Sequence, residues 1–175
     1  INYCNLVLAK APEAYKNDPN FTQSQLNAKM AEALTLRALA YFYLVRTFGE
    51  VPLITEASLT DRQDYNLPKS SEKVVLDQLE ADLIKAEGWA LTRYSNTVSN
   101  KGRITKTAVR ALLADIYLWR NKYAECVSYC DKVIADPTLK MIEADDEPYF
   151  RIFGMKNSTE SIFELQFSAS NNTPN

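Results

Sequence analysis

Histidine is absent from the 175-residue sequence, and glycine occurs four times. Without histidine the chain has no Ser-His or Cys-His nucleophile pair and no imidazole base for neutral pH. The four glycines form no glycine-rich phosphate loop. No apolar stretch approaches the roughly 20 residues that a membrane-spanning helix requires. We therefore expect no catalytic residues and predict that the protein is not an enzyme.

The net charge is also small, and cysteines are few. The net charge of −2 gives no reason to expect nucleic acid as a partner. Cys126 and Cys130 are spaced to share one helix face, but a metal site would still need Cys4 and a carboxylate. A disulfide within one helix has poor geometry, so we predict that both cysteines are packing residues. The acidic stretch 145–147 is interpreted as a solvated loop, and we expect no metal or cofactor.

Apolar spacing and capping residues predict a mainly helical chain. Thr22 followed by Gln25 has the pattern of a capping box, in which each side chain bonds the other residue's backbone amide. Alternation of polar and apolar residues over 162–168 predicts a half-buried strand. The predicted helices cover residues 1–15, 22–48, 71–91, 105–119 and 122–135.

The segment from Arg37 to Leu53 is the most informative part of the sequence. Residues 38–45 are apolar or aromatic without a break. A helix with one solvent-exposed face would show polar residues at every third or fourth position. We therefore predict a central helix that other helices cover on nearly all sides. Gly49 and Pro52 predict that it ends sharply.

Two helices also resemble the first helix of a tetratricopeptide repeat. Leu113, Ala114 and Tyr117 fit its small and aromatic positions, and Leu39-Ala40 with Tyr43 repeat the pattern. Single repeats cannot bury their faces alone, so neighbouring pairs must stack. The predicted fold is mainly α, with tetratricopeptide-like antiparallel helix pairs over residues 1–137. Residues 138–175 would begin an incomplete portion rich in loops and strands, with a short β element near the C-terminus.

Sugar-binding sites combine exposed aromatic rings with hydrogen-bonding side chains. Trp89 and Tyr94 lie around the loop after the third predicted helix, and Tyr65 lies with Arg62 and Asp64 in the long loop over residues 54–69. These five residues are the candidate ligand-binding residues. Alternatively, the rings close helix ends against the core.

The segment 37–53 resembles the hallmark of the SusD/RagB family, which joins an Arg-Ala pair, a Tyr-Phe-Tyr-Leu run and Phe-Gly-x-Val-Pro-Leu. Residues 66–71, 102–114 and 160–167 resemble further family segments in the same order. The resemblance implies that the aromatic run is a packing element and not a binding site. The structural hallmark residues are Arg37, Tyr41, Phe42, Tyr43, Phe48, Gly49 and Pro52.

Members of this family are surface nutrient-binding lipoproteins of Bacteroidetes, which implies an outer-membrane, cell-surface location. By resemblance, the protein would capture oligosaccharides and pass them to a SusC-like TonB-dependent transporter, against which the helical repeats dock. The membrane contact would be a lipid anchor absent from this chain, since nothing resembling a lipobox precedes Cys4. The chain thus resembles an internal fragment. No cofactor is implied, although some relatives hold a structural calcium ion.

Three other functions stay open. A RagB-type member would capture peptides, and nothing in the sequence separates this from glycan capture. A long regular array of repeats would favour a cytoplasmic tetratricopeptide adaptor that binds protein segments, but the loop over 54–69 and the terminal strand argue against it. An all-α glycosidase would release hydrolysis products from a glycan.

Overall fold

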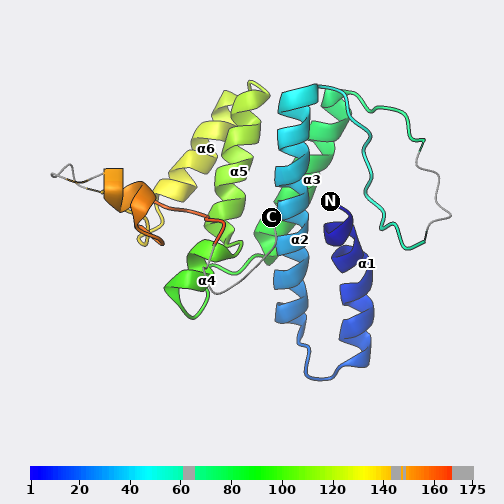
Figure 1. Ribbon diagram of the computed structural model, residues 1–175, viewed down its shortest axis with the longest axis horizontal. Helices are drawn as coiled ribbons and strands as arrows, with labels where there is room; N and C mark the ends of the chain where they lie inside the picture. The colour runs from blue at the N-terminus through cyan, green and yellow to red at the C-terminus, as the bar shows by residue number, and fades with distance from the viewer. Residues whose placement is uncertain (61–65, 143–146, 148, 167–175) are drawn as a thin grey trace.

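The fold is a stack of antiparallel helices, seen in a computed structural model that describes residues 1–60, 66–142, 147 and 149–166. Successive long helices alternate in direction (Figure 1), which confirms the predicted fold class. α2 packs most extensively against α3 and then α1, while α5 packs against α6 and α3. The helices are α1 (Asn2–Asn17), α2 (Gln23–Phe48), α3 (Glu72–Trp89), α4 (Thr97–Gly102), α5 (Lys106–Trp119) and α6 (Tyr123–Ile134), followed by a π-helical turn, η1 (Phe150–Gly154).

Side-chain caps set the starts of the long central helices. The predicted capping box at the start of α2 is present, with Thr22 accepting from the Gln25 amide and Gln25 from the Thr22 amide. The side chains of Ser71 and Thr105 cap α3 and α5 by accepting from the amides of Val74 and Ala108, without the reciprocal bond. Capping is worth about 1 kcal/mol per helix, so these residues fix where each helix enters the stack.

The core lies where α2, α3 and α5 meet. An aromatic pair from α2 is buried against aliphatic residues of the other two helices. Each such side chain contributes about 1.5–3 kcal/mol through its removal from water. The largest fully buried apolar side chains are Tyr41, Phe42, Leu79, Leu83, Leu113 and Ile116.

The prediction that α2 is covered on nearly all sides is wrong for one face. Tyr43 and Phe48 of the hallmark are 65% and 67% exposed, and Leu36 is also exposed. Leu36 and Tyr43 lie seven residues apart and so share a side of the helix. The neighbours of α2 leave this side open. Within the unbroken run 38–45 the residue on this side is aromatic Tyr43, so no polar position in the run marks it.

Arg37 joins four parts of the chain inside the stack. Its guanidinium donates to Asp82 of α3 at 2.6 Å and to Asn5 of α1 at 2.9 Å. It also donates to the carbonyl of Thr55 at 3.1 Å. The role of this hallmark residue is therefore to satisfy and link polar groups where α1, α2 and α3 meet the segment after α2.

The exit from α2 is fixed by backbone contacts. Gly49 has a φ of +70°, a conformation that side-chain-bearing residues rarely adopt. The Tyr41 hydroxyl accepts from the amide of Ile54 at 2.7 Å and donates to its carbonyl at 3.1 Å. Val51 and Ser70 then form an antiparallel bridge that closes the connection between α2 and α3.

Two smaller expectations differ from the structure. Cys126 packs against the core, but Cys130 is exposed because α6 is the outer helix and buries none of its residues, so the packing prediction is wrong for Cys130. The predicted strand lies partly outside the described residues, and its described portion, 162–166, forms no strand. No helix among the described residues is long and apolar enough to cross a membrane.

Candidate functional site

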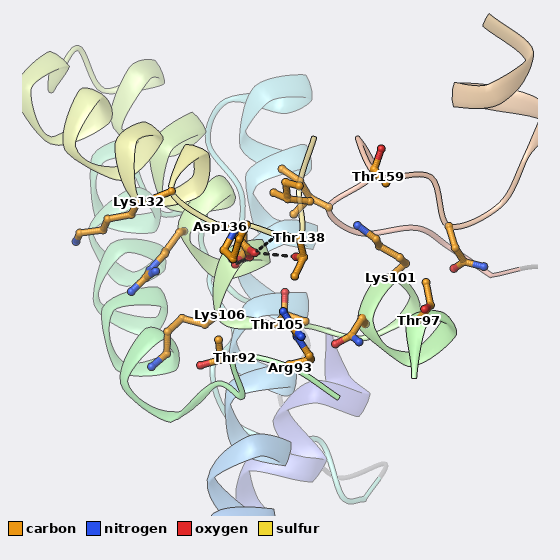
Figure 2. A pocket seen from close by; sticks show the side chains of 18 residues that line it. Thr92, Arg93, Thr97, Lys101, Thr105, Lys106, Lys132, Asp136, Thr138 and Thr159 are labelled. Atoms are coloured by element: carbon orange, nitrogen blue, oxygen red, sulfur yellow. Dashed lines mark hydrogen bonds between the residues drawn. The ribbon is translucent and has the colours of Figure 1, made fainter. Parts of the chain in front are cut away.

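A cavity of about 600 Å³ lies beside α4, where α5 begins and α6 ends. Its walls come from residues 92–110, from 132–139 and from the segment 157–162. Figure 2 shows Lys101 and Thr97 on one side, Lys106 and Lys132 on the other, and Asp136 with Thr138 between them. Further hydrogen-bonding side chains in the lining are Thr92, Asn100, Thr105, Thr107, Asn157 and Thr159.

Local hydrogen bonds shape the wall formed by residues 92–106. The amide of Lys106 donates to the carbonyl of Leu91 at 2.8 Å, which closes this segment into a loop. Asn100 accepts from the Tyr94 amide at 2.6 Å and donates to the Tyr94 carbonyl at 3.2 Å. Asn96 caps α4 by accepting from the Ser99 amide. These bonds give a polar loop a fixed shape.

Asp136 is the carboxylate of the cavity, and its oxygens are already engaged. Thr107 and the Thr138 hydroxyl donate to it, the latter at 2.7 Å, and the Thr138 amide donates at 3.0 Å. Burial would raise the pKa of Asp136, but these hydrogen bonds and the charge of Arg93 outweigh burial and lower that pKa. The group therefore stays ionised and holds the end of α6 to the start of α5.

Lys101 is a buried lysine in the opposite wall. Its ammonium donates to the carbonyl of Ser161, and the amide of Glu164 donates back to the Lys101 carbonyl at 2.7 Å. Burial lowers the pKa of Lys101, while the charges of Asp136 and Glu164 oppose that shift. Lys101 thereby ties α4 to the segment that closes the cavity.

Arg110 and Lys132 belong to a second cluster at the cavity edge. Arg110 donates to Glu87 at 2.7 Å, and the hydroxyl of Tyr129 donates to the same carboxylate at 3.0 Å. Burial would raise the pKa of Glu87, but the two hydrogen bonds outweigh it and the pKa is lowered. The Lys132 ammonium lies 3.8 Å from the ring centre of Tyr129, within range of a cation–π contact.

Two cationic side chains of the cavity, Arg93 and Lys106, have neither a bonded partner among the described residues nor the ring contact that Lys132 makes. Within the described part of the chain, neither side chain forms an ion pair or a hydrogen bond with another protein group. Arg93 is exposed and Lys106 is half-buried. Their donors are therefore available to a ligand.

The candidate residues Trp89 and Tyr94 do not line this cavity. Trp89 is half-buried against the core, with the Lys85 ammonium 4.7 Å from its ring centre. The hydroxyl of Tyr94 lies 3.0 Å from the carbonyl of Ile104 and 3.2 Å from Glu32. These contacts favour the interpretation that both rings close helix ends.

The guanidinium of Arg103 lies 4.4 Å from the ring centre of Tyr94. The same guanidinium forms an ion pair with the Glu32 carboxylate at a nitrogen–oxygen distance of 2.6 Å. Burial and the Glu32 charge raise the pKa of Tyr94 to about 12. The other candidates, Arg62, Asp64 and Tyr65, lie outside the described residues. A binding role for all five candidates stays a prediction.

Sequence reasoning missed the cavity. Its cations are separated by neutral and apolar residues along the chain, so no basic run marks them. The fold brings them together by placing the end of α6 beside the start of α5. Among the described residues, no three His, Cys, Asp or Glu side chains are grouped so that they could hold a metal ion.

Comparison with known proteins places the chain in a family. Residues 1–118 match the family model SusD-like_3, described as "Starch-binding associating with outer membrane". SusD-like protein P38 of Formosa agariphila is 32% identical over 131 residues, which cover 75% of this chain and 24% of that protein.

Solved structures of SusD-like proteins also superpose on this chain. A laminarin-binding SusD-like protein superposes with a TM-score of 0.76 at 30% identity, covering 93% of this chain and 34% of the other. A SusD-like protein of Bacteroides fragilis gives a TM-score of 0.77 at 27% identity, covering 94% of this chain and 32% of the other. The chain thus spans about a quarter to a third of the length of these relatives. From the matched residues and the shared stack of helices, the chain belongs to the SusD-like family.

Proposed function

We propose that this chain belongs to a glycan-binding lipoprotein at the cell surface, which captures oligosaccharides for a TonB-dependent transporter of the SusC type. The observation that carries the proposal is the 30% identity and TM-score of 0.76 with a SusD-like protein that binds laminarin. The family description, "Starch-binding associating with outer membrane", supports both the ligand class and the location.

The cavity supports binding of a small polar ligand. Its volume of about 600 Å³ lies within the range of about 300–1,000 Å³ typical of ligand pockets. The hydroxyls of Thr92, Thr97 and Thr159 in its lining can donate and accept, as sugar hydroxyls do, and the amide of Asn157 can donate.

Binding without hydrolysis is the function that these side chains favour. Asp136 is occupied by Thr107 and Thr138, and its lowered pKa makes it a poor general acid. Hydrolysis of a glycoside ordinarily uses two carboxyl groups facing one another across a cleft. The described lining of the cavity contains one carboxylate.

Family membership supports a transporter partner, and the helical repeats are the part of the chain proposed to contact it. Co-purification of the tagged chain from cells that produce a SusC-like transporter tests this step separately from glycan binding. Recovery of the transporter with the tagged chain supports the partnership, and its absence under conditions where glycan still binds contradicts it.

Calorimetry of the full chain against a panel of oligosaccharides and peptides tests the ligand class, with chromatography of the ligand after incubation. We expect heat of binding with at least one oligosaccharide and full recovery of that ligand. Release of shorter products would indicate a glycosidase. Binding of peptides alone would indicate a RagB-type function, and binding of neither class would contradict the proposal.

A further inference from the structure

The cavity is a positively charged site within an acidic chain. Its described lining carries five cationic side chains and one carboxylate, whereas the whole chain has a net charge of −2. A concave surface lined by one sign of charge concentrates the field and attracts ligands of the opposite sign. The charge of the site is therefore a property of this cavity and not of the chain as a whole.

The cations of the lining are not all engaged by the protein. Arg110 is paired with Glu87, and Lys101 donates to the Ser161 carbonyl. Arg93 and Lys106 have no such partner in the described part of the chain. Asp136, the nearby carboxylate, is itself bonded by Thr107 and Thr138. The donors of Arg93 and Lys106 are thus left for a ligand, although the charge of Arg93 also acts on Asp136 and Lys132 adds a third cation held by a ring contact alone.

Aromatic rings are missing from the described residues that line the cavity. Stacking on such rings is how a site gains energy from the apolar face of a neutral sugar. Here the available contacts are charge-assisted hydrogen bonds from Arg93 and Lys106 and neutral ones from the threonine and asparagine side chains. This set of groups favours a ligand that bears both negative charge and hydroxyls.

We propose that the cavity binds an anionic oligosaccharide, with Arg93 and Lys106 contacting its carboxylate or sulfate-ester groups. This proposal rests on the proposed glycan-binding function and adds the charge of the ligand. Arg93 can present two parallel donors to a carboxylate or sulfate, and Lys106 acts as a point charge. The hydroxyl-bearing side chains around them would bond the sugar ring.

Calorimetry of the full chain with three tetrasaccharides tests the proposal: a galacturonate, a sulfated galactan fragment and a neutral β-glucan fragment. We expect the galacturonate, the sulfated ligand or both to bind at least about tenfold more tightly than the neutral one, as one charge-assisted contact would give. Raising the salt concentration from about 0.01 M to 1 M should weaken that preference, because the Debye length falls from about 30 to 3 Å.

Substitutions locate the site. Arg93→Gln and Lys106→Gln should each weaken binding of the preferred anionic ligand by roughly tenfold. Lys16→Gln, which changes the net charge equally on an exposed position of α1, should leave binding within about twofold. Thermal unfolding of each variant shows whether the fold is retained.

The outcomes separate the two proposals. Equal or tighter binding of the neutral tetrasaccharide overturns the proposal that the ligand is anionic and leaves the proposed glycan binding intact. Binding of no tetrasaccharide overturns both proposals. Anionic binding that is unchanged in folded Arg93→Gln and Lys106→Gln overturns this cavity as the site. Inorganic sulfate that binds as tightly as the sulfated ligand overturns recognition of the sugar.

Discussion

Arg37 and Asp82 lie 45 positions apart in the sequence and form an ion pair with a nitrogen–oxygen distance of 2.6 Å. Their side chains are 6% and 8% exposed, so the pair is removed from solvent. Gln78 donates to the second Asp82 oxygen at 2.9 Å, which leaves the carboxylate fully bonded. Breaking such a pair from one side leaves a buried charge without its partner.

We expect Arg37→Met to lower the free energy of unfolding by about 3–5 kcal/mol, because Asp82 would stay buried and unpaired. Urea unfolding followed by circular dichroism measures the change. The double variant Arg37→Met/Asp82→Leu should be more stable than Arg37→Met, since both charges are gone. A cost below about 1 kcal/mol for the single change would show that the pair is solvated in solution.

Gly49 and Gly88 should respond to alanine in opposite directions. Neither added methyl group would meet another atom, so backbone conformation decides the result. Gly49 has a φ of +70°, and alanine there should cost about 1–3 kcal/mol. Gly88 lies within α3, where alanine should stabilise by roughly 0.5–1 kcal/mol. Thermal unfolding of the two variants in one buffer makes the comparison, and a shift in the same direction for both would refute it.

The capping box of α2 predicts the effect of Thr22→Ala. Removing the hydroxyl leaves the Gln25 amide without its acceptor, and the expected loss of stability is about 1 kcal/mol. Ser24→Ala, two residues along on the exposed side of the helix, is the control and should stay within about 0.5 kcal/mol. Chemical unfolding resolves this difference. Equal effects of the two changes would mean that the cap adds nothing.

The pH dependence of stability should change in Thr107→Val. Because the pKa of Asp136 is lowered in the folded state, its contribution is present above its unfolded pKa of about 3.9 and is lost as the pH falls through the folded value. Thr107→Val removes one donor to that carboxylate and should cost about 0.5–1.5 kcal/mol at pH 7.

Below pH 4 the cost of Thr107→Val should become smaller, because protonated Asp136 no longer accepts as a charged group. Unfolding in urea at several pH values from 7 to 3 measures this trend. Thr97→Val, which lines the same cavity without bonding Asp136, is the matched control and should show no such trend. A pH-independent cost for Thr107→Val would contradict the role of the hydrogen bond.

Sequence patterns predicted the parts of the fold that depend on local chemistry. Thr22 and Gln25 indicated the start of α2 correctly, because a cap is read from neighbouring residues. α4 was missed because Thr97–Gly102 has no apolar periodicity, and its position depends on Asn96 and on contacts from the distant Ser161 and Glu164.

Burial and the candidate site depend on packing, which single-sequence patterns describe poorly. Tyr43 follows buried Tyr41 and Phe42 in the same aromatic run, yet it is exposed to solvent on a side of α2 that no neighbouring helix covers. Arg93, Lys106 and Lys132 become parts of one cavity through the way α5 and α6 pair. Neither result could be obtained from residue type and spacing alone.

The bridge between Val51 and Ser70 has a consequence for variation among related proteins. With Ser70 donating to Val51 at 3.0 Å, the two ends of the α2–α3 connection are pinned beside each other by the bundle. Lengthening a loop whose ends are already together costs about 0.6 kcal/mol for each doubling. Outside residues 54–58, which bond α1 and α2, insertions in this connection should therefore be tolerated during evolution, and an epitope or a fluorescent label could be grafted there without disturbing the helices.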